Sequence, residues 1–446
     1  MSDTLFGTDG IRGTAGIFPL DAATVRRVGA ALIKALPHSD AKLLIGRDTR
    51  ESGVWIEREL AHGARLAGAS VHSIGVGPTP AVAFLTGSLD FDAGVVISAS
   101  HNPYQDNGIK VFSGAGVKYS GQFEKKIEAL VADRHWQLSD GDAPEVPRAD
   151  HLRKYAEHAR SVLPNLAKLG RVRMAVDCAN GAMTTVAPAL FEELGFDVTV
   201  LGAEPDGQNI NRGVGSTHPE KLAALVAQGG YRLGVAFDGD GDRAILVDGN
   251  GRVLDGDHVM LMCARQMSIE GRLRGNAVVA TVMSNIGLEI ALRKLGIELI
   301  RTKVGDKYVM EEMQRKNLSL GGEQSGHLIF SEHLFTGDGL ITALSVLRTM
   351  AASGRELSDL ANDLTTYPQV LLNVRVREKT VLDEIPEVAA LMKRVEDGLG
   401  ANGRLLVRYS GTEPLLRVML EGQDLGQIEQ WARQIVDAVN QAIGQR

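Results

Sequence analysis

The first stretch that decides the fold reads Lys42-Leu-Leu-Ile-Gly-Arg-Asp-Thr-Arg-Glu-Ser-Gly53. An apolar run typical of a strand is followed by a polar, glycine-containing loop and an apolar-periodic segment that extends to Gly68. A second short strand is predicted at Ser70–Ile74. This order of strand, loop, helix and strand is typical of a parallel βαβ unit.

The same order recurs twice. One copy starts at the strand 172–176 and passes through a helix to the strand 197–200, and the other starts at the strand 277–282 and passes through a helix to the strand 297–300. Repetition at this scale favours three α/β domains of related topology. The alternative is that α/β proteins share this order in general, without true structural repetition.

The last 80 or so residues follow another pattern, with strands predicted at 371–376, 404–409 and 415–421 among helical segments. This pattern indicates a small α+β domain. The final helix has one apolar stripe that needs a sheet to cover it, so Trp431 is predicted to be a core residue. The stripe consists of Ile428, Trp431, Ala432, Ile435, Val439 and Ala442.

Length and composition limit the possible functions. The chain has 446 residues, enough for about three domains of ordinary size or four smaller ones. A net charge of −7 argues against non-specific nucleic-acid binding, which needs a basic face. The two cysteines, Cys178 and Cys263, form no disulfide framework, and no export signal or membrane-spanning run is visible, so a cytoplasmic protein with buried cysteines is expected.

The loop after the predicted strand 93–97 reads Ser98-Ala-Ser-His-Asn-Pro-Tyr-Gln-Asp-Asn-Gly-Ile-Lys110. Ser100 is a candidate nucleophile, because ligands of α/β sheets bind beyond the carboxyl ends of strands. A hydrolase pair with His101 is not expected, since neighbours on a turn rarely point at each other. An Asn-Pro turn with a Ser/His cap is the equally simple alternative.

The loop after the predicted strand 233–237 reads Asp238-Gly-Asp-Gly-Asp-Arg243. Three carboxylates separated by glycines can converge on one cation, because glycine allows sharp turns and Mg²⁺ prefers oxygen ligands. An EF-hand is excluded, since its sixth and twelfth positions would be Arg243 and Gly249. The alternative, a solvated acidic turn, leaves the mutual repulsion of the carboxylates without compensation.

Two further loops are weaker signals alone. Gly321-Gly-Glu-Gln-Ser-Gly-His327 offers hydrogen-bonding groups for a sugar and a titratable histidine, although a glycine-rich turn with a surface histidine would look the same. Val407-Arg-Tyr-Ser-Gly-Thr-Glu-Pro-Leu-Leu-Arg417 combines hydroxyls, backbone N–H groups and arginines suited to an anion. A tight hairpin with exposed arginines is the alternative there.

Together the four loops, and the opening Phe6-Gly-Thr-Asp-Gly-Ile-Arg-Gly13, resemble the α-D-phosphohexomutase family over essentially the whole chain. The resemblance implies that Ser100 carries a phosphoryl group and that Mg²⁺ is held by this serine with the acidic loop. It also implies that the third loop reads the sugar and that the fourth holds the phosphate that does not react. The implied metal ligands are Ser100, Asp238, Asp240 and Asp242, the sugar ligands are Glu323 and Ser325, and the phosphate ligands are Arg408, Ser410, Gly411, Thr412 and Arg417.

The resemblance further implies three topologically similar α/β domains and a C-terminal α+β domain around a central cleft, with domains at 1–151, 152–252, 253–367 and 368–446. The expected catalysts are Lys110 and His327 as acid/base groups, with Arg12 and Arg243 stabilising the charge of the transferring group. Lys110 could act as a base at neutral pH only if its pKa were lowered. A hexosamine 1,6-bisphosphate is the expected intermediate and activator.

Substrate and partners follow from the same resemblance. The opening motif, the sugar loop and Gly215-Ser-Thr-His218 look like the branch that acts on glucosamine phosphates, although Val214 stands where that branch often has cysteine. Glucose and mannose phosphates are the nearest alternative. A non-catalytic sugar-phosphate-binding protein would leave Ser100 unused, and a serine hydrolase lacks the Gly-x-Ser-x-Gly elbow. The expected partner is a small sugar phosphate, with neither nucleic acid nor membrane, and a homodimer would be usual for the family although no interface pattern is visible.

Overall fold

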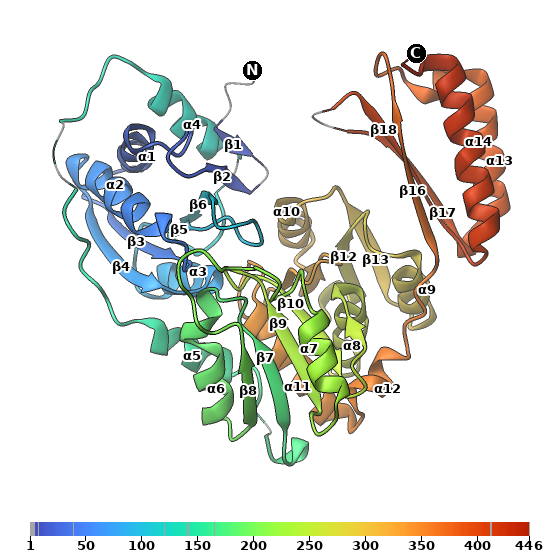
Figure 1. Cartoon of the computed structure of the whole chain (residues 1–446), viewed down its shortest axis with the longest axis horizontal. Helices are drawn as coiled ribbons and strands as arrows, with labels where there is room; N and C mark the ends of the chain where they lie inside the picture. The colour runs from blue at the N-terminus through green and yellow to red at the C-terminus, as the bar shows by residue number, and fades with distance from the viewer. Residues whose placement is uncertain are drawn as a thin grey trace. The chain divides into compact units, whose positions relative to one another are not determined.

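A computed structural model describes residues 5–7, 9–38, 40–119, 121–139, 141, 143–164, 166–410 and 413–445. It divides into two compact units, which we describe separately. The first comprises the chain up to Met283 together with Leu299–Asp363, and the second comprises Ser284–Glu298 and Leu364–Arg446. Figure 1 follows the chain through both units.

The first sheet has six strands in the order β1-β2-β6-β5-β3-β4. The strands β4, β3 and β5 are parallel, and β6 and β2 continue the sheet antiparallel. The core between this sheet and its helices is built from Val, Ile, Leu and Ala side chains. The elements are β1 Phe6–Gly7, β2 Gly10–Thr14, α1 Ala22–Ala35, β3 Lys42–Arg47, α2 Ser52–Leu66, β4 Ser70–Val76, α3 Thr79–Ser88, β5 Ala93–Ile97, β6 Asp106–Ser113 and α4 Gly121–Ala132.

The second sheet has the order β11-β10-β9-β7-β8. Again three strands are parallel (β8, β7 and β9), and the next, β10, is antiparallel. The elements are α5 Leu152–Arg160, β7 Arg173–Asp177, α6 Ala187–Glu193, β8 Asp197–Leu201, α7 Glu220–Ala227, β9 Leu233–Phe237, β10 Ala244–Asp248 and β11 Val253–Leu254, with short 3₁₀ turns at Leu166–Leu169 and Ala182–Thr185.

The third sheet has the order β13-β12-β14-β15, with β12 and β14 parallel and β15 antiparallel to β14. The elements are α8 Gly256–Ile269, β12 Ala277–Thr281, α9 Ile286–Lys294, β13 Glu298–Thr302, α10 Asp306–Lys316, β14 Leu320–Gly322, β15 Leu328–Phe330, α11 Gly339–Ser353 and α12 Leu357–Ala361, with a 3₁₀ turn at Arg274–Asn276. Four strands of each sheet therefore follow one order, which confirms the predicted repetition: β4-β3-β5-β6, β8-β7-β9-β10 and β13-β12-β14-β15.

The C-terminal sheet has the order β16-β18-β17, all antiparallel. Its helices cover one face, and most of the predicted apolar stripe of α14 is buried in that core, while Trp431 and Ala442 are partly buried and pack against it. Asn285 and Ile286, at the start of α9, bond to the buried Glu421 of β18, so α9 belongs to this unit. The elements are β16 Gln369–Arg375, α13 Pro386–Leu399, β17 Arg404–Tyr409, β18 Leu415–Glu421 and α14 Leu425–Ile443, with 3₁₀ turns at Leu382–Glu384 and Gly400–Asn402.

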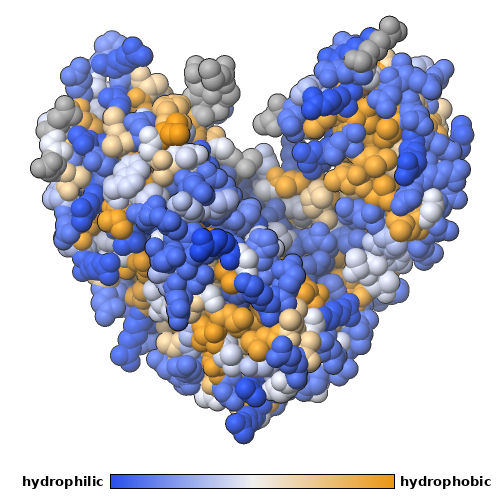
Figure 2. Space-filling view, in the orientation of Figure 1, coloured by the Kyte–Doolittle hydropathy of each residue, from blue (hydrophilic) through white to orange (hydrophobic). Residues whose placement is uncertain are grey.

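The surface is mainly hydrophilic on the face shown in Figure 2, with apolar areas between the polar ones, including one over the C-terminal unit. Cys178 and Cys263 are free and buried, as predicted. Among the described residues, no helix is both long enough and apolar enough to cross a lipid bilayer.

Candidate active site

Three of the four loops singled out in the sequence occupy the same topological position. Each joins the third strand of a repeat to its antiparallel fourth strand: residues 98–105 join β5 to β6, residues 238–243 join β9 to β10, and residues 323–327 join β14 to β15. All three lie in the first unit. The repeated topology thus supplies three loops for one site, and their different sequences supply different chemistry.

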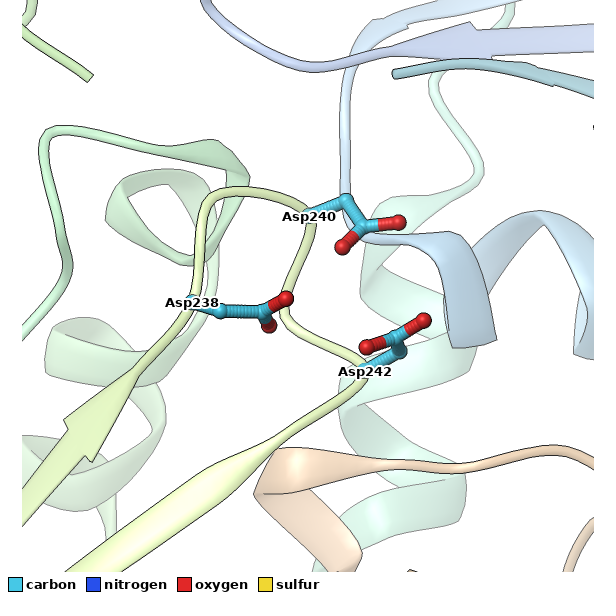
Figure 3. Close-up of side chains that lie close together, drawn as sticks. All are labelled: Asp238, Asp240 and Asp242. Carbon is cyan, nitrogen blue, oxygen red and sulfur yellow. The ribbon is translucent and has the colours of Figure 1, made fainter. Parts of the chain in front are cut away.

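The acidic loop 238–243 is buried and its three carboxylates converge. One oxygen each of Asp238, Asp240 and Asp242 lie within 4.8 Å of one another, and Figure 3 shows the three side chains arranged around a common space. Gly241 has a positive φ of 72°, which lets the chain reverse between Asp240 and Asp242. The Arg243 N–H donates to Asp238 Oδ1 at 3.1 Å and closes the turn.

This set of oxygens fits a divalent cation. Oδ1 of Asp240 and Oδ1 of Asp242 are buried and have no hydrogen-bond partner among the described residues, which is costly unless a ligand is bound there. Burial, followed by the charges of Asp242 and Asp240, raises the pKa of Asp238 well above its usual range. A bound cation would relieve both the unmet acceptors and the repulsion.

Lys110 on β6 lies against the same carboxylates. Its Nζ donates to Asp240 at 2.9 Å and to Asp242 at 3.0 Å, and its side chain is 1% exposed. Burial lowers the pKa of Lys110, but Asp240, Asp242 and Asp9 outweigh burial and hold it well above its usual range. The lowered pKa that a lysine base requires is therefore not met in this arrangement, because the carboxylates that surround the ammonium group stabilise its charge.

Ser100 faces the acidic loop. Its Oγ donates to Asp238 Oδ2 at 2.5 Å, and its backbone is left-handed, with φ of 54°. The side chain of His101 also approaches, with Nδ1 3.4 Å from Ser100 Oγ. The expectation that these neighbours do not point at each other was wrong, because the left-handed turn at Ser100 brings the two side chains to one side.

A cavity of about 500 Å³ opens beside this pair of loops. Arg12, His101, Arg243, Glu323 and His327 line it, so it gathers side chains from all three repeats. Arg12 pairs with Asp9, and Arg243 Nε lies 3.8 Å from Asp242 Oδ1. The cavity offers cations for an anionic group next to hydrogen-bonding partners for a polar ligand.

The polar residues of the third loop, 323–327, have different surroundings, and not all of them line the cavity. His327 is buried, with Nδ1 3.5 Å from Asp242 and Nε2 3.7 Å from Asp306; burial lowers its pKa, but Asp242 and Asp306 raise it to a net value above normal. Glu323 Oε1 accepts from the Gly305 N–H, and Ser325 donates to Glu323 Oε2 at 3.3 Å, so Ser325 supports Glu323. Of these three, Glu323 and His327 line the cavity.

Gln324 does not face the cavity. Its side-chain Nε2 donates to Asp255 Oδ2 at 3.0 Å, and its backbone carbonyl oxygen accepts from the Gly256 N–H at 2.9 Å. The residue between Glu323 and Ser325 therefore anchors the loop to the start of α8.

Sequence reasoning missed several residues of the site. Lys118 bonds both Asp9 and Asp306, which line the cavity, and Thr79 donates to Asp240 Oδ2 at 2.6 Å. Asp9 lies inside the opening motif at residues 6–13, so the sequence did contain a signal for it. Lys118 and Thr79 lie outside every motif, and only the folded chain brings them to these carboxylates.

The fourth loop lies in the C-terminal unit, between β17 and β18. Arg408 and Arg417 are directly opposite each other in the antiparallel ladder, and Arg417 Nε is buried without a hydrogen-bond partner among the described residues. Ser410 is buried at the end of the hairpin. Gly411 and Thr412, also predicted phosphate ligands, lie outside the described residues.

Comparison with known proteins agrees with this geometry. Models of the four phosphoglucomutase/phosphomannomutase domains match: the α/β/α domains I, II and III at residues 3–137, 153–251 and 255–367, and the C-terminal domain at residues 371–438. The chain therefore belongs to the phosphoglucomutase/phosphomannomutase family, the phosphohexose mutases. The predicted family, fold class and enzyme class are confirmed.

Two relatives and one solved structure are similar to this chain over almost its full length. Phosphoglucosamine mutase of Geobacter metallireducens is 48% identical over 446 residues, and 99% of each chain is covered. Phosphoglucosamine mutase of Syntrophotalea carbinolica is 47% identical over 453 residues, covering 100% of this chain and 99% of the relative. The crystal structure of a phosphoglucomutase/phosphomannomutase family protein from Burkholderia thailandensis has a TM-score of 0.81 at 25% identity, covering 99% and 98% of the two chains.

Proposed function

We propose that this chain interconverts glucosamine 6-phosphate and glucosamine 1-phosphate through a phosphoserine at Ser100, and that the product supplies UDP-N-acetylglucosamine synthesis. The observation that carries the proposal is the contact of Ser100 Oγ with Asp238, beside two further buried carboxylates. The full-length similarity to proteins named phosphoglucosamine mutase supports the choice of sugar.

In the proposed reaction the phosphoryl group leaves Ser100 Oγ and bonds to the 1-hydroxyl oxygen of glucosamine 6-phosphate. The hydroxyl proton passes to an acid/base group of the site, and the product is glucosamine 1,6-bisphosphate. This intermediate turns over in the cavity, and the bond between O6 and phosphorus breaks as the phosphoryl group returns to Ser100 Oγ. The 6-oxygen takes back a proton from an acid/base group of the site, and glucosamine 1-phosphate is released. Added hexosamine 1,6-bisphosphate would therefore act as an activator by rephosphorylating Ser100.

The chain's own residues divide the remaining tasks. Asp238, Asp240 and Asp242, with the phosphate on Ser100, would hold Mg²⁺, which when bound supplies positive charge for the transferring group. Arg12 and Arg243, which line the cavity, would bind that group's oxygens. Lys110 and His327, both buried against the acidic loop, are the proposed acid/base groups. Because Asp242 favours the protonated form of each, the one that takes the hydroxyl proton must first give up its own.

Glu323, supported by Ser325, would accept hydrogen bonds from the sugar. The phosphate that does not react would bind the C-terminal hairpin, where two opposed arginines favour an anion. Its proposed ligands are Arg408, Ser410, Gly411, Thr412 and Arg417.

We also propose a cytoplasmic homodimer with domains at 1–151, 152–252, 253–367 and 368–446. The two unpaired, buried cysteines support a reducing compartment. Light scattering across a dilution series would test the dimer.

The first test is a coupled assay with Mg²⁺ and a catalytic amount of hexose 1,6-bisphosphate, comparing glucosamine, glucose and mannose phosphates on one preparation. A preference for glucosamine in kcat/KM of about a hundredfold, or roughly 2.7 kcal/mol, is expected. A preference for glucose or mannose phosphate would be consistent with the proposed mechanism but would overturn the assignment of glucosamine phosphate as the substrate. No turnover of any of them would favour a sugar-phosphate-binding protein.

A further inference from the structure

Two backbone carbonyls of the Ser100 loop, those of Ser100 and Asn102, each accept two hydrogen bonds from buried side chains. Arg50 Nη2 donates to the carbonyl oxygens of Ser100 and Asn102 at 3.0 and 2.7 Å. Asn211 Nδ2 donates to the same two oxygens at 2.9 and 3.2 Å. A carbonyl oxygen has two lone pairs, so both acceptor positions of Ser100 are occupied.

The N–H group of Ser100 is fixed as well. It donates to Ser98 Oγ at 2.9 Å, and Ser98 in turn donates to Asp48 Oδ2. Asp48 Oδ2 lies 3.3 Å from Arg50 Nε, and Asp48 Oδ1 accepts from the Arg50 N–H. One buried network therefore holds both polar groups of the Ser100 backbone.

This arrangement is costly, which argues that it serves the site. Ser100 has a left-handed backbone, which residues other than glycine rarely adopt. Arg50 is 0% exposed, and its Nη1 has no hydrogen-bond partner among the described residues. Burying a charge this completely costs free energy of desolvation, so stabilisation of the fold alone does not explain Arg50.

The second repeat contributes to the position of this first-repeat loop. Asn211 follows β8, in the same repeat as the acidic loop, and itself has a left-handed φ of 59°. Gly239 of the acidic loop packs so closely that a Cβ there would lie 2.5 Å from the Ser100 carbonyl oxygen. The Ser100 loop is therefore held against the loop whose Asp238 its hydroxyl contacts.

We propose that Arg50 and Asn211 are positioning residues for phosphoryl transfer, which hold the Ser100 backbone so that Oγ faces the acidic loop. The inference rests on the proposed role of Ser100. Neither residue is proposed to touch the transferring group; both act through the Ser100 and Asn102 carbonyls. Transfer requires the oxygen and the incoming hydroxyl in one geometry, so small displacements reduce kcat more than they weaken substrate binding.

Two variants of Asn211 separate its side chain from its backbone. Asn211→Gly keeps the left-handed backbone without strain but removes the amide. Asn211→Asp keeps the shape but puts an acceptor where a donor is needed. Both should lower kcat by about 10²-fold while KM changes by less than about threefold. Asn317→Gly is the matched control, because Asn317 is exposed at the end of α10 with a similar φ of 52°, and its kcat should equal that of the wild type.

Arg50→Lys tests geometry against charge. A lysine keeps the positive charge but lacks the guanidinium fork, so kcat should be at least about tenfold below that of the wild type. The circular dichroism spectrum should be unchanged, which shows that the variant is folded. Recovery of wild-type kcat in Arg50→Lys would overturn the positioning role of this residue.

The decisive readouts are steady-state kinetics, thermal melting and the phosphorylated fraction of Ser100 by intact mass, measured together on these variants and on Ser100→Ala. Wild-type kcat in both Asn211 variants, with only a lower melting temperature, would show a structural role and overturn the inference. Full activity in Ser100→Ala would instead overturn the proposed function. If Ser100→Ala loses activity while both Asn211 variants keep the wild-type kcat, the positioning role is overturned and the proposed function stands.

Discussion

Two regions of the molecule each bring side chains of like charge close together. The loop between β9 and β10 gathers carboxylates, and the hairpin between β17 and β18 gathers arginines. In the first, three carboxylates bring oxygens within 4.8 Å of one another. In the second, two arginines, Arg408 and Arg417, stand directly opposite across a ladder. Like charges at these positions repel, so each group would be stabilised by an ion of the other sign.

The two regions differ in what holds them. The acidic loop is fixed by other elements of the first unit: Thr79 bonds Asp240, and the Gly339 N–H of α11 donates to the Gly241 carbonyl at 3.0 Å. The arginines extend from neighbouring strands of a single sheet. We infer that the acidic loop is a preorganised cation site and that the hairpin is an independent anion site, so mutations should separate metal dependence from phosphate affinity.

The largest expected effect is at Ser100, which contacts the acidic loop. Ser100→Ala removes the only group proposed to carry the phosphoryl group, so multiple turnover should fall by at least about 10³-fold. The coupled assay measures the rate, and intact mass should show no phosphorylated form. Ser88→Ala, at the exposed end of α3, is the control. A Ser100→Ala enzyme with most of its activity would exclude the phosphoserine scheme.

Asp240→Asn should weaken the cation site and leave the anion site unchanged. Loss of one charged ligand should lower kcat/KM by about 10²-fold at fixed Mg²⁺ and raise the Mg²⁺ concentration for half-maximal rate. The measurement is a Mg²⁺ titration after treatment with EDTA, with Asp197→Asn as the exposed control. An unchanged Mg²⁺ requirement would mean that these carboxylates do not hold the metal.

Arg417→Lys should affect the anion site alone. Lysine keeps the charge but loses the bidentate geometry, so KM should rise by about tenfold, or about 1.4 kcal/mol, with kcat within about threefold. The Mg²⁺ titration should be unchanged, and Arg433→Lys on the exposed side of α14 should behave as the wild type. A shift in Mg²⁺ requirement would contradict the separation of the two sites.

The sequence allowed the repeats and the loops to be predicted because both leave local patterns. Parallel strands buried on both faces read as runs of Val, Ile and Leu, and the glycine-rich loops after them are recognisable without coordinates. The predicted strand 415–421 coincides with β18. The grouping of α9 with the C-terminal sheet was not predictable, because it depends on long-range contacts, such as those of Asn285 and Ile286 with Glu421.

The same limit applies to the site. Asp238, Asp240 and Asp242 alternate with glycines in five consecutive residues, so the convergence of their carboxylates could be predicted. The pKa of Lys110 could not, because it depends on Asp9, Asp240 and Asp242, which only folding brings to its Nζ. Arg50 lies in the polar loop that follows β3, and nothing local in the sequence shows that its guanidinium reaches the Ser100 carbonyl.

The smallest expected effect tests what holds the acidic loop. Asp338 caps α11 by accepting from the Ile341 N–H, and the Tyr155 hydroxyl donates to both of its carboxylate oxygens at 3.0 Å. Burial raises the pKa of Asp338 to about 6, although the Ile341 N–H and Tyr155 lower it. Because the folded-state pKa lies above the unfolded value of about 4, this carboxyl makes the fold less stable as pH rises from about 4 to about 6.

Tyr155→Phe removes a donor to the charged form, so the pKa of Asp338 should rise further. The loss of stability should be about 1.5–3 kcal/mol near pH 8, where Asp338 is ionised in the wild type, and about 1 kcal/mol near pH 5, where it is mostly protonated. Thermal melting at both pH values measures the difference, and Tyr231→Phe, whose hydroxyl bonds the neutral Thr199, should show no such pH dependence. Because α11 holds Gly241, the Mg²⁺ requirement should rise slightly in Tyr155→Phe while KM for the sugar phosphate stays constant; a change in KM instead would mean that the two charged sites are coupled through the fold.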